Sequence, residues 1–214
     1  MSDDLFREVD EEVRQDQYLE LGKKYGAYAI GVALVVVLIT VGFVFWRDSQ
    51  QAARDASGEQ LLAAINIAED QADQALDQFA ILGEEGTKGY RLLARFREGA
   101  LLSQTGDVRG AVAVYDKVAE DSSHDQIYRD LAKVLAVSHG MSIMNLGEVE
   151  ERLASVLDDD NSWRYSAREL VATAVMASGD SAAAREAFQA LVDDVEAPAG
   201  VRARGAEMLA ILAQ

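Results

Sequence analysis

The longest apolar stretch of the chain covers residues 25–46, where 22 residues follow one another without a charged side chain. As an α-helix this stretch would be about 33 Å long, enough to cross the hydrocarbon core of a bilayer. Tyr25, Tyr28 and Trp46 stand near its ends, where aromatic rings prefer the headgroup region. The pattern therefore predicts a transmembrane helix, with the buried helix of a soluble protein as the alternative.

Residues 1–24 form an acidic leader before this stretch, with eight acidic and four basic residues. An acidic leader and a long apolar centre differ from a cleaved signal peptide, so we expect an uncleaved anchor. Four basic residues precede the stretch, whereas Arg47 and Arg54 lie just beyond it. This excess favours a cytoplasmic N-terminus and places residues 47–214 outside, which in a bacterial inner membrane means the periplasm.

After the membrane segment the hydropathy pattern becomes that of amphipathic helices joined by short turns. With Gly106 and Asp107 as one turn, a small residue lies seven before the glycine (Gly99), another five after it (Ala111), and an aromatic residue nine after it (Tyr115). The same offsets around Gly179 and around Asp70 give two further sets: Ala172, Ala184 and Phe188, and Ala63, Ala75 and Phe79. A weaker copy around Gly147 gives Gly140 and Val156, with Arg152 in place of a small residue.

These turn markers, at residues 70, 106, 147 and 179, are 36, 41 and 32 residues apart. The pattern resembles the tetratricopeptide repeat, a helical hairpin of about 34 residues in which small side chains allow two helices to approach closely. We therefore expect about four hairpins, closed by a C-terminal capping helix that begins near Pro198 and carries Met208, Leu209, Ile211 and Leu212. An irregular helical bundle with glycine turns is the alternative.

Composition agrees with an all-α fold, because the chain is rich in Ala, Leu and Glu and contains a single proline. It contains no cysteine, which excludes disulfides, thiol nucleophiles and cysteine-based metal sites. Residues 47–214 contain 29 acidic and 16 basic residues, a net charge of −13. Such a charge repels phosphate backbones and anionic headgroups, so we expect neither nucleic-acid binding nor flat docking of this domain on lipid.

A short acidic leader, one membrane span and degenerate tetratricopeptide-like hairpins follow one another in this chain. This order resembles the YfgM family, single-pass ancillary subunits of the bacterial Sec translocon. The local match lies just past the span in "WRDSQQAARDAS", at Trp46, Ser49, Ala53, Arg54, Ala56 and Ser57. The resemblance implies a periplasmic repeat domain that associates with translocon subunits and a membrane-anchored periplasmic chaperone and helps to handle newly exported polypeptides.

In tetratricopeptide arrays the first helix of each hairpin lines a groove. Counted from the turns, nine residues would face it: Phe96, Ala100, Ser103, Val137, Met141, Met144, Glu169, Thr173 and Met176. Methionine and phenylalanine side chains would suit adaptable contacts with apolar peptide segments. The alternative is that these side chains are ordinary core between successive helices.

The sequence offers little support for catalysis or metal binding. Residues 157–163 bring three acidic residues together but lack the alternating oxygens and glycine turn of a calcium loop. His124 and His139 have no partner at a metal-binding spacing. Because no phosphate loop, nucleophile elbow or paired-carboxylate motif occurs, we expect a binding protein that needs no cofactor.

Small residues gather in one half of the membrane segment, at Ala27, Ala29, Gly31 and Ala33, where they would permit close packing on a partner helix. The leader places Leu5, Phe6, Val9 and Val13 on one helical face, which fits either a docking helix or a disordered acidic tail.

The function expected is that of an anchored scaffold for protein interactions, as a translocon accessory. An envelope assembly scaffold, in cell division or outer-membrane assembly, is the main alternative. A cytoplasm-facing adaptor would require the opposite topology.

Overall fold

The structure is a computed structural model that describes the backbone of residues 2–213 and the side chains of Tyr28 and residues 30–213. The chain is 83% helical and no strand occurs in residues 2–213, which confirms the predicted all-α class. The main helices are α1 (Ser2–Ile67), α2 (Ala72–Glu85), α3 (Lys88–Gln104), α4 (Val108–Glu120), α5 (Gln126–Gly140), α6 (Leu146–Leu153), α7 (Arg164–Ala177), α8 (Ser181–Asp193) and α9 (Ala199–Leu212).

Residues 1–53 form the first of two compact units and consist of most of α1. The large apolar side chains described between Tyr28 and Trp46 are all exposed, so they form no part of a protein core. Within the described residues, the segment Ile30–Ile67 contains a window that is long and apolar enough to cross a membrane. This agrees with the predicted span and disfavours a buried helix of a soluble protein.

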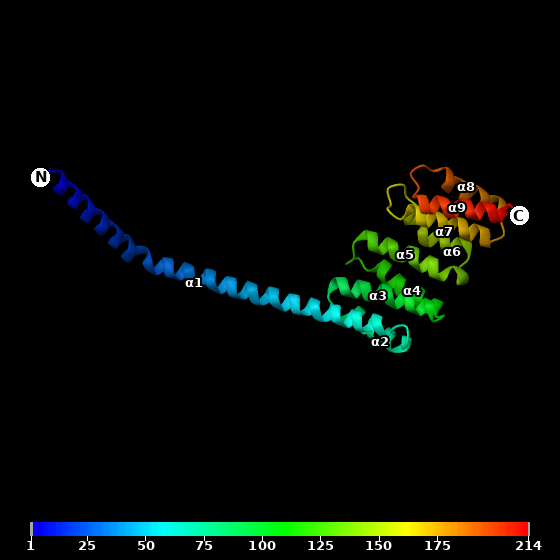
Figure 1. Ribbon diagram of the computed structural model, residues 1–214, viewed down its shortest axis with the longest axis horizontal. Helices are drawn as coiled ribbons and strands as arrows, with labels where there is room; N and C mark the ends of the chain where they lie inside the picture. Colours follow the sequence, from blue (N-terminus) through cyan, green and yellow to red (C-terminus); the bar gives the residue numbers. More distant parts are fainter. Residues whose placement is uncertain (1, 214) are drawn as a thin grey trace. The chain divides into compact units, whose positions relative to one another are not determined.

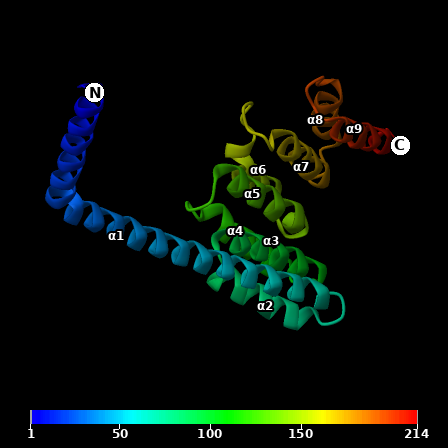
Figure 2. The same ribbon diagram turned by 60° about the vertical axis from the view of Figure 1, so that its left-hand side comes forward.

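Residues 54–214 form the second unit, a series of helical hairpins. Helices α3 to α9 follow one another in chain order (Figures 1 and 2), and each packs on its neighbours. The end of α1 packs with α2 and α3 through a cluster that contains Leu61, Ala64 and Phe79. The hairpins are therefore the end of α1 with α2, then α3 with α4, α5 with α6, and α7 with α8, followed by α9.

Counted from the start of its second helix, each hairpin buries the fourth, eighth and eleventh residues; in the third hairpin the eleventh, Val156, lies in the 3-10 turn Ala154–Val156 that follows α6. This spacing places the three side chains on one face of the helix, and each is at most 3% exposed. The four sets are Ala75, Phe79 and Leu82; Ala111, Tyr115 and Val118; Val149, Leu153 and Val156; and Ala184, Phe188 and Leu191. The repetition confirms the tetratricopeptide-like organisation over the irregular bundle.

Two of the predicted turns have the expected backbone. Gly106 and Gly179 adopt φ angles of 94° and 93°, in the left-handed region that favours glycine. The residue after each glycine caps the following helix. The Asp107 side chain accepts a hydrogen bond from the Gly110 N–H at the start of α4, and the Asp180 side chain accepts one from the Ala183 N–H at the start of α8. The Gly-Asp pair thus ends one helix and starts the next.

The prediction for the third hairpin was wrong in register. Its second helix starts after Asn145, which forms a capping box with Glu148, so Gly147 lies inside α6 rather than in the turn. Val149 and Leu153 therefore occupy the small and aromatic positions, and Val156 takes the third buried position. Arg152 lies outside this buried face and forms an ion pair with Asp116.

The first hairpin and the C-terminal helix need smaller corrections. Ala63 is exposed, and it is its neighbour Ala64 that is fully buried. Pro198 stands at the N-cap of α9, one residue before the helix. Met208, Leu209 and Leu212 pack on the last core cluster as expected of a cap, whereas Ile211 is 55% exposed.

Tyr115 joins three successive helices. Its ring packs 6.3 Å from that of Phe96 on α3 and stacks 5.5 Å from the His139 imidazole on α5. Gly99 on α3 makes room for this ring, because a Cβ there would lie 2.7 Å from the Tyr115 Cζ. His139 is held in turn by a 2.9 Å hydrogen bond between its Nδ1 and the Ser103 hydroxyl. The small and aromatic positions of the repeat therefore meet in direct contact.

Candidate functional site

The nine residues predicted to face a groove come from the first helices of three successive hairpins and the turn after α5. Val137 is completely buried in the core between α5, α6 and α7, so its assignment to a groove was wrong. The other eight are partly buried. Their part in partner binding stays a prediction.

Most of these eight side chains already have contacts inside the repeat domain. Met141 and Met144 pack against the core cluster that contains Val137, and Met176 packs against the last core cluster. Phe96 packs against the ring of Tyr115. These contacts agree with the alternative interpretation that the apolar members fill space between helices.

The polar members of the set are also engaged. The Thr173 hydroxyl donates a 2.8 Å hydrogen bond to the Glu169 carbonyl. The Glu169 carboxylate accepts two 2.6 Å hydrogen bonds from the Arg204 guanidinium on α9. This bidentate pair attaches the capping helix to α7.

The structure contains an apolar pocket of about 490 Å³ between the first turns of α3 and α5. Its lining includes Lys88, Tyr90, Leu92, Leu93, His124, Asp125 and Tyr128. Leu93 is 49% exposed and Tyr128 is 43% exposed, although both side chains are large and apolar.

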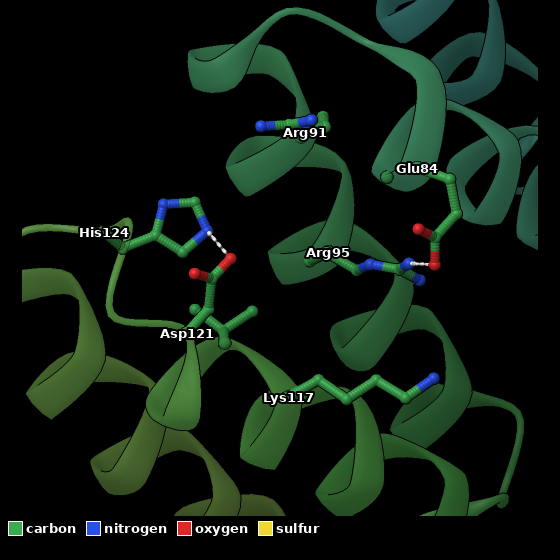
Figure 3. A pocket seen from close by; sticks show the side chains of 8 residues that line it. Glu84, Arg91, Arg95, Lys117, Asp121 and His124 are labelled. Atoms are coloured by element: carbon green, nitrogen blue, oxygen red, sulfur yellow. Dashed lines mark hydrogen bonds and ion pairs between the residues drawn. The ribbon is translucent and has the colours of Figure 1, made fainter.

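A second pocket, of about 270 Å³ and mostly charged, adjoins the C-terminal ends of α2 and α4. Figure 3 shows the residues that line it, among them the labelled Glu84, Arg91, Arg95, Lys117, Asp121 and His124. Arg91 extends from α3 towards the side held by His124 and Asp121, whereas Arg95 extends towards Glu84 (Figure 3). His124 lines both pockets, which makes them neighbours.

The carboxylates of the charged pocket have partners of their own. Glu84 pairs with Arg95, which also bonds Glu98 at 2.8 Å. Asp121 accepts a 2.8 Å hydrogen bond from the Ser123 N–H, and this bond is the main reason why the pKa of its carboxyl lies below the ordinary 3.8. The His124 Nε2 lies 3.5 Å from the Asp121 carboxylate.

Four Lys and Arg side chains line the two pockets, and three of them have no ion pair among the described residues: Lys88, Arg91 and Lys117. Two of them lie on α3, which carries four basic residues and one acidic residue in a chain of net charge −17. Sequence reasoning missed both pockets, because it searched for groove positions and known motifs. The available signal was the stretch "KGYRLLARFR", in which bases alternate with large apolar residues.

The acidic segment 157–163 is bound to α5 by side chains. Asp130 is 2% exposed, and its carboxylate accepts hydrogen bonds from Gln126 at 2.8 Å and from Asn161 at 2.9 Å. The Trp163 indole N–H donates to the Ile127 carbonyl at 2.9 Å. No group of three potential ligands placed to hold a metal ion occurs among the described residues.

The small residues predicted for packing in the membrane lie only partly within the described side chains. Gly31 and Ala33 are described and exposed, and a Cβ at Gly31 would meet nothing within 4 Å. Ala27 and Ala29 lie outside the described side chains, as does the predicted apolar face of the leader. Packing on a partner helix through these four positions stays a prediction.

In a comparison with protein families, the model of the tetratricopeptide repeat-like domain matches residues 22–206. No curated protein and no solved structure matches the chain. The matched region covers the predicted membrane segment and all four hairpins, and the repeated burial of three positions per hairpin agrees with it. The chain belongs to the tetratricopeptide repeat-like domain family.

Proposed function

We propose that the protein is a membrane-anchored scaffold for protein interactions and serves as an ancillary subunit of the bacterial Sec translocon. The observation that carries this proposal is the family match over residues 22–206, which joins a helix apolar enough to span a membrane to a tetratricopeptide-like domain. Domains of this kind are typically non-catalytic interaction modules. The translocon itself is proposed from the resemblance to the YfgM family.

In this proposal residues 1–24 are a cytoplasmic leader, residues 25–46 cross the inner membrane, and residues 47–214 lie in the periplasm. The anchor keeps the repeat domain close to the membrane, where exported polypeptides emerge. Tethering two proteins in this way raises their effective concentration without any new contact. The proposed partners are translocon subunits, a membrane-anchored periplasmic chaperone and exported polypeptides.

Copurification tests the proposal. Membranes of cells that produce the chain with a C-terminal tag are solubilised in mild detergent, and the recovered proteins are quantified by mass spectrometry. An unrelated single-pass protein with the same tag serves as the control. Enrichment of Sec channel subunits and a periplasmic chaperone over this control is expected; enrichment of a cell-division or outer-membrane assembly complex instead would contradict the translocon role.

The proposed topology has its own test. The chain contains no cysteine, so one introduced cysteine is its only thiol. Ala182 is exposed on α8 and belongs to the domain proposed to lie in the periplasm. In intact cells, a thiol reagent that cannot cross the inner membrane should label Ala182→Cys and spare Ser2→Cys. The reverse pattern would place the repeat domain in the cytoplasm.

A further inference from the structure

The two neighbouring pockets around His124 offer a partner both apolar and charged contacts. The apolar pocket presents Leu93 and Tyr128, each more than 40% exposed. Its volume of about 490 Å³ is large enough for one or two side chains, at the small end of the range for ligand pockets. Lys88 also lines this pocket, and Arg91, in the adjoining charged pocket, extends towards the side held by His124 (Figure 3).

The charges around the two pockets indicate what kind of partner fits. Their linings together contain four cations and three carboxylates, whereas the whole chain has a net charge of −17. Of the carboxylates, Glu84 is paired with Arg95, Asp121 is held by the Ser123 N–H and His124, and Asp125 lines the apolar pocket without an ion pair among the described residues. Lys88 and Arg91 have no ion pair among the described residues, although the charge of Arg91 contributes to the lowered pKa of the Asp121 carboxyl, and both side chains line the pockets where an incoming anion would meet them.

We propose that these pockets bind one segment of a partner protein in which a large apolar side chain enters between Leu93 and Tyr128 and neighbouring carboxylates pair with Lys88 and Arg91. The inference rests on the proposed function only in that the chain binds protein partners. A membrane is the less suitable occupant, because the domain's overall negative charge repels anionic headgroups.

Binding is measured by fluorescence anisotropy with the full chain in mild detergent and three labelled ten-residue peptides. The first carries a Leu-Phe pair flanked by aspartates, the second has lysines in place of the aspartates, and the third has alanines in place of the Leu-Phe pair. The first is expected to bind, and to bind more weakly as salt screens the charges. The other two are expected to bind at least about fivefold more weakly.

Two variants remove one kind of contact each. Lys88→Glu reverses an exposed charge at the first residue of α3, where a negative charge suits the helix dipole and leaves the fold intact. Its matched control is Arg109→Glu, the same change in the exposed first turn of α4. Leu93→Ala removes the apolar contact, with Leu62→Ala, another exposed leucine of the repeat domain, as its control.

Lys88→Glu and Leu93→Ala should each weaken binding of the acidic apolar peptide by at least about fivefold, whereas the two controls should stay within about twofold. Equal loss in pocket variants and controls, or tighter binding of the lysine peptide, would overturn the inference. So would binding to anionic lipid vesicles that Lys88→Glu abolishes, because it would identify a lipid surface as the occupant.

The failure of this inference is distinguishable from failure of the proposed function. If Lys88→Glu and Leu93→Ala leave peptide binding intact while Sec subunits still copurify with the chain, this site is overturned and the translocon proposal stands. If the peptide binds as expected and no Sec subunit is recovered, the site stands and the translocon proposal falls.

Discussion

Gly99→Ala tests the contact on which the repeat depends. The added Cβ would lie 2.7, 2.8 and 3.0 Å from Cζ, Cε1 and Cε2 of the Tyr115 ring. Carbon atoms in ordinary contact stay about 3.5–4.0 Å apart, so the ring would have to move by nearly 1 Å. It has little room to do so, because Phe96 packs on it from α3 and His139 stacks on it from α5.

The loss of stability expected for Gly99→Ala follows from two opposing effects. Forcing a methyl group into a packed core costs about 1–3 kcal/mol, and replacing glycine by alanine within a helix returns up to about 1 kcal/mol. A net loss of about 1–2 kcal/mol is therefore expected, equivalent to a rise of about 5- to 30-fold in the population of the opened state. Gly89→Ala is the control in the same helix, because a Cβ at Gly89 meets nothing within 4 Å.

Hydrogen exchange measured by mass spectrometry on the full chain in detergent reports the effect locally. Gly99→Ala should speed exchange in peptides from α3 and α4, and Gly89→Ala should leave it unchanged or slow it. In a Tyr115→Leu background the added methyl group has more room, so Gly99→Ala should cost much less there. Equal behaviour of the two glycine variants, or the same cost in both backgrounds, would refute the proposed contact.

Three further predictions concern residues of the same domain. Burial raises the pKa of Tyr115 from 10.0 to about 12, so stability present below pH 10 should fall as the pH rises towards 12; urea unfolding of Tyr115→Phe should lack this component. Asn161→Ala removes a hydrogen bond to the buried Asp130 carboxylate and should destabilise residues 157–163 by about 1–3 kcal/mol, seen as faster exchange there and not in the exposed-site control Ser162→Ala. Glu169→Gln replaces one charge of the bidentate pair with Arg204 and should speed exchange in α9 while α3 stays unchanged.

The parts of the fold that sequence predicted best are those where a residue type has one local role. Gly106 and Gly179 each precede an aspartate, and both stand at turns with a positive φ. Gly147 misled the same reasoning, because glycine is also tolerated in the first turn of a helix and the start of α6 is set by Asn145. When positions are counted from the capping residue Asn145 at the start of α6, Val149 and Leu153 take the expected repeat positions.

The candidate site was harder to predict because it depends on neighbours distant in sequence. The position of Val137 in an array suggested a groove, yet packing of α6 and α7 on α5 buries it completely. The pockets around His124 combine residues from α2, α3, α4 and α5. No local spacing in the sequence predicts such an arrangement, and the alternation of basic and apolar residues along α3 was the one local signal available.

The most direct test of the anchored translocon scaffold is photo-crosslinking in living cells from a reactive amino acid placed at Leu93. Leu93 is 49% exposed at the apolar pocket, and Ile211 on α9, 55% exposed, is the matched control position. The proposal predicts that crosslinks from Leu93 include Sec channel subunits or the chaperone bound to them, and that Ile211 gives fewer. Crosslinks from Leu93 only to cytoplasmic proteins, or only to a different envelope complex, would contradict it.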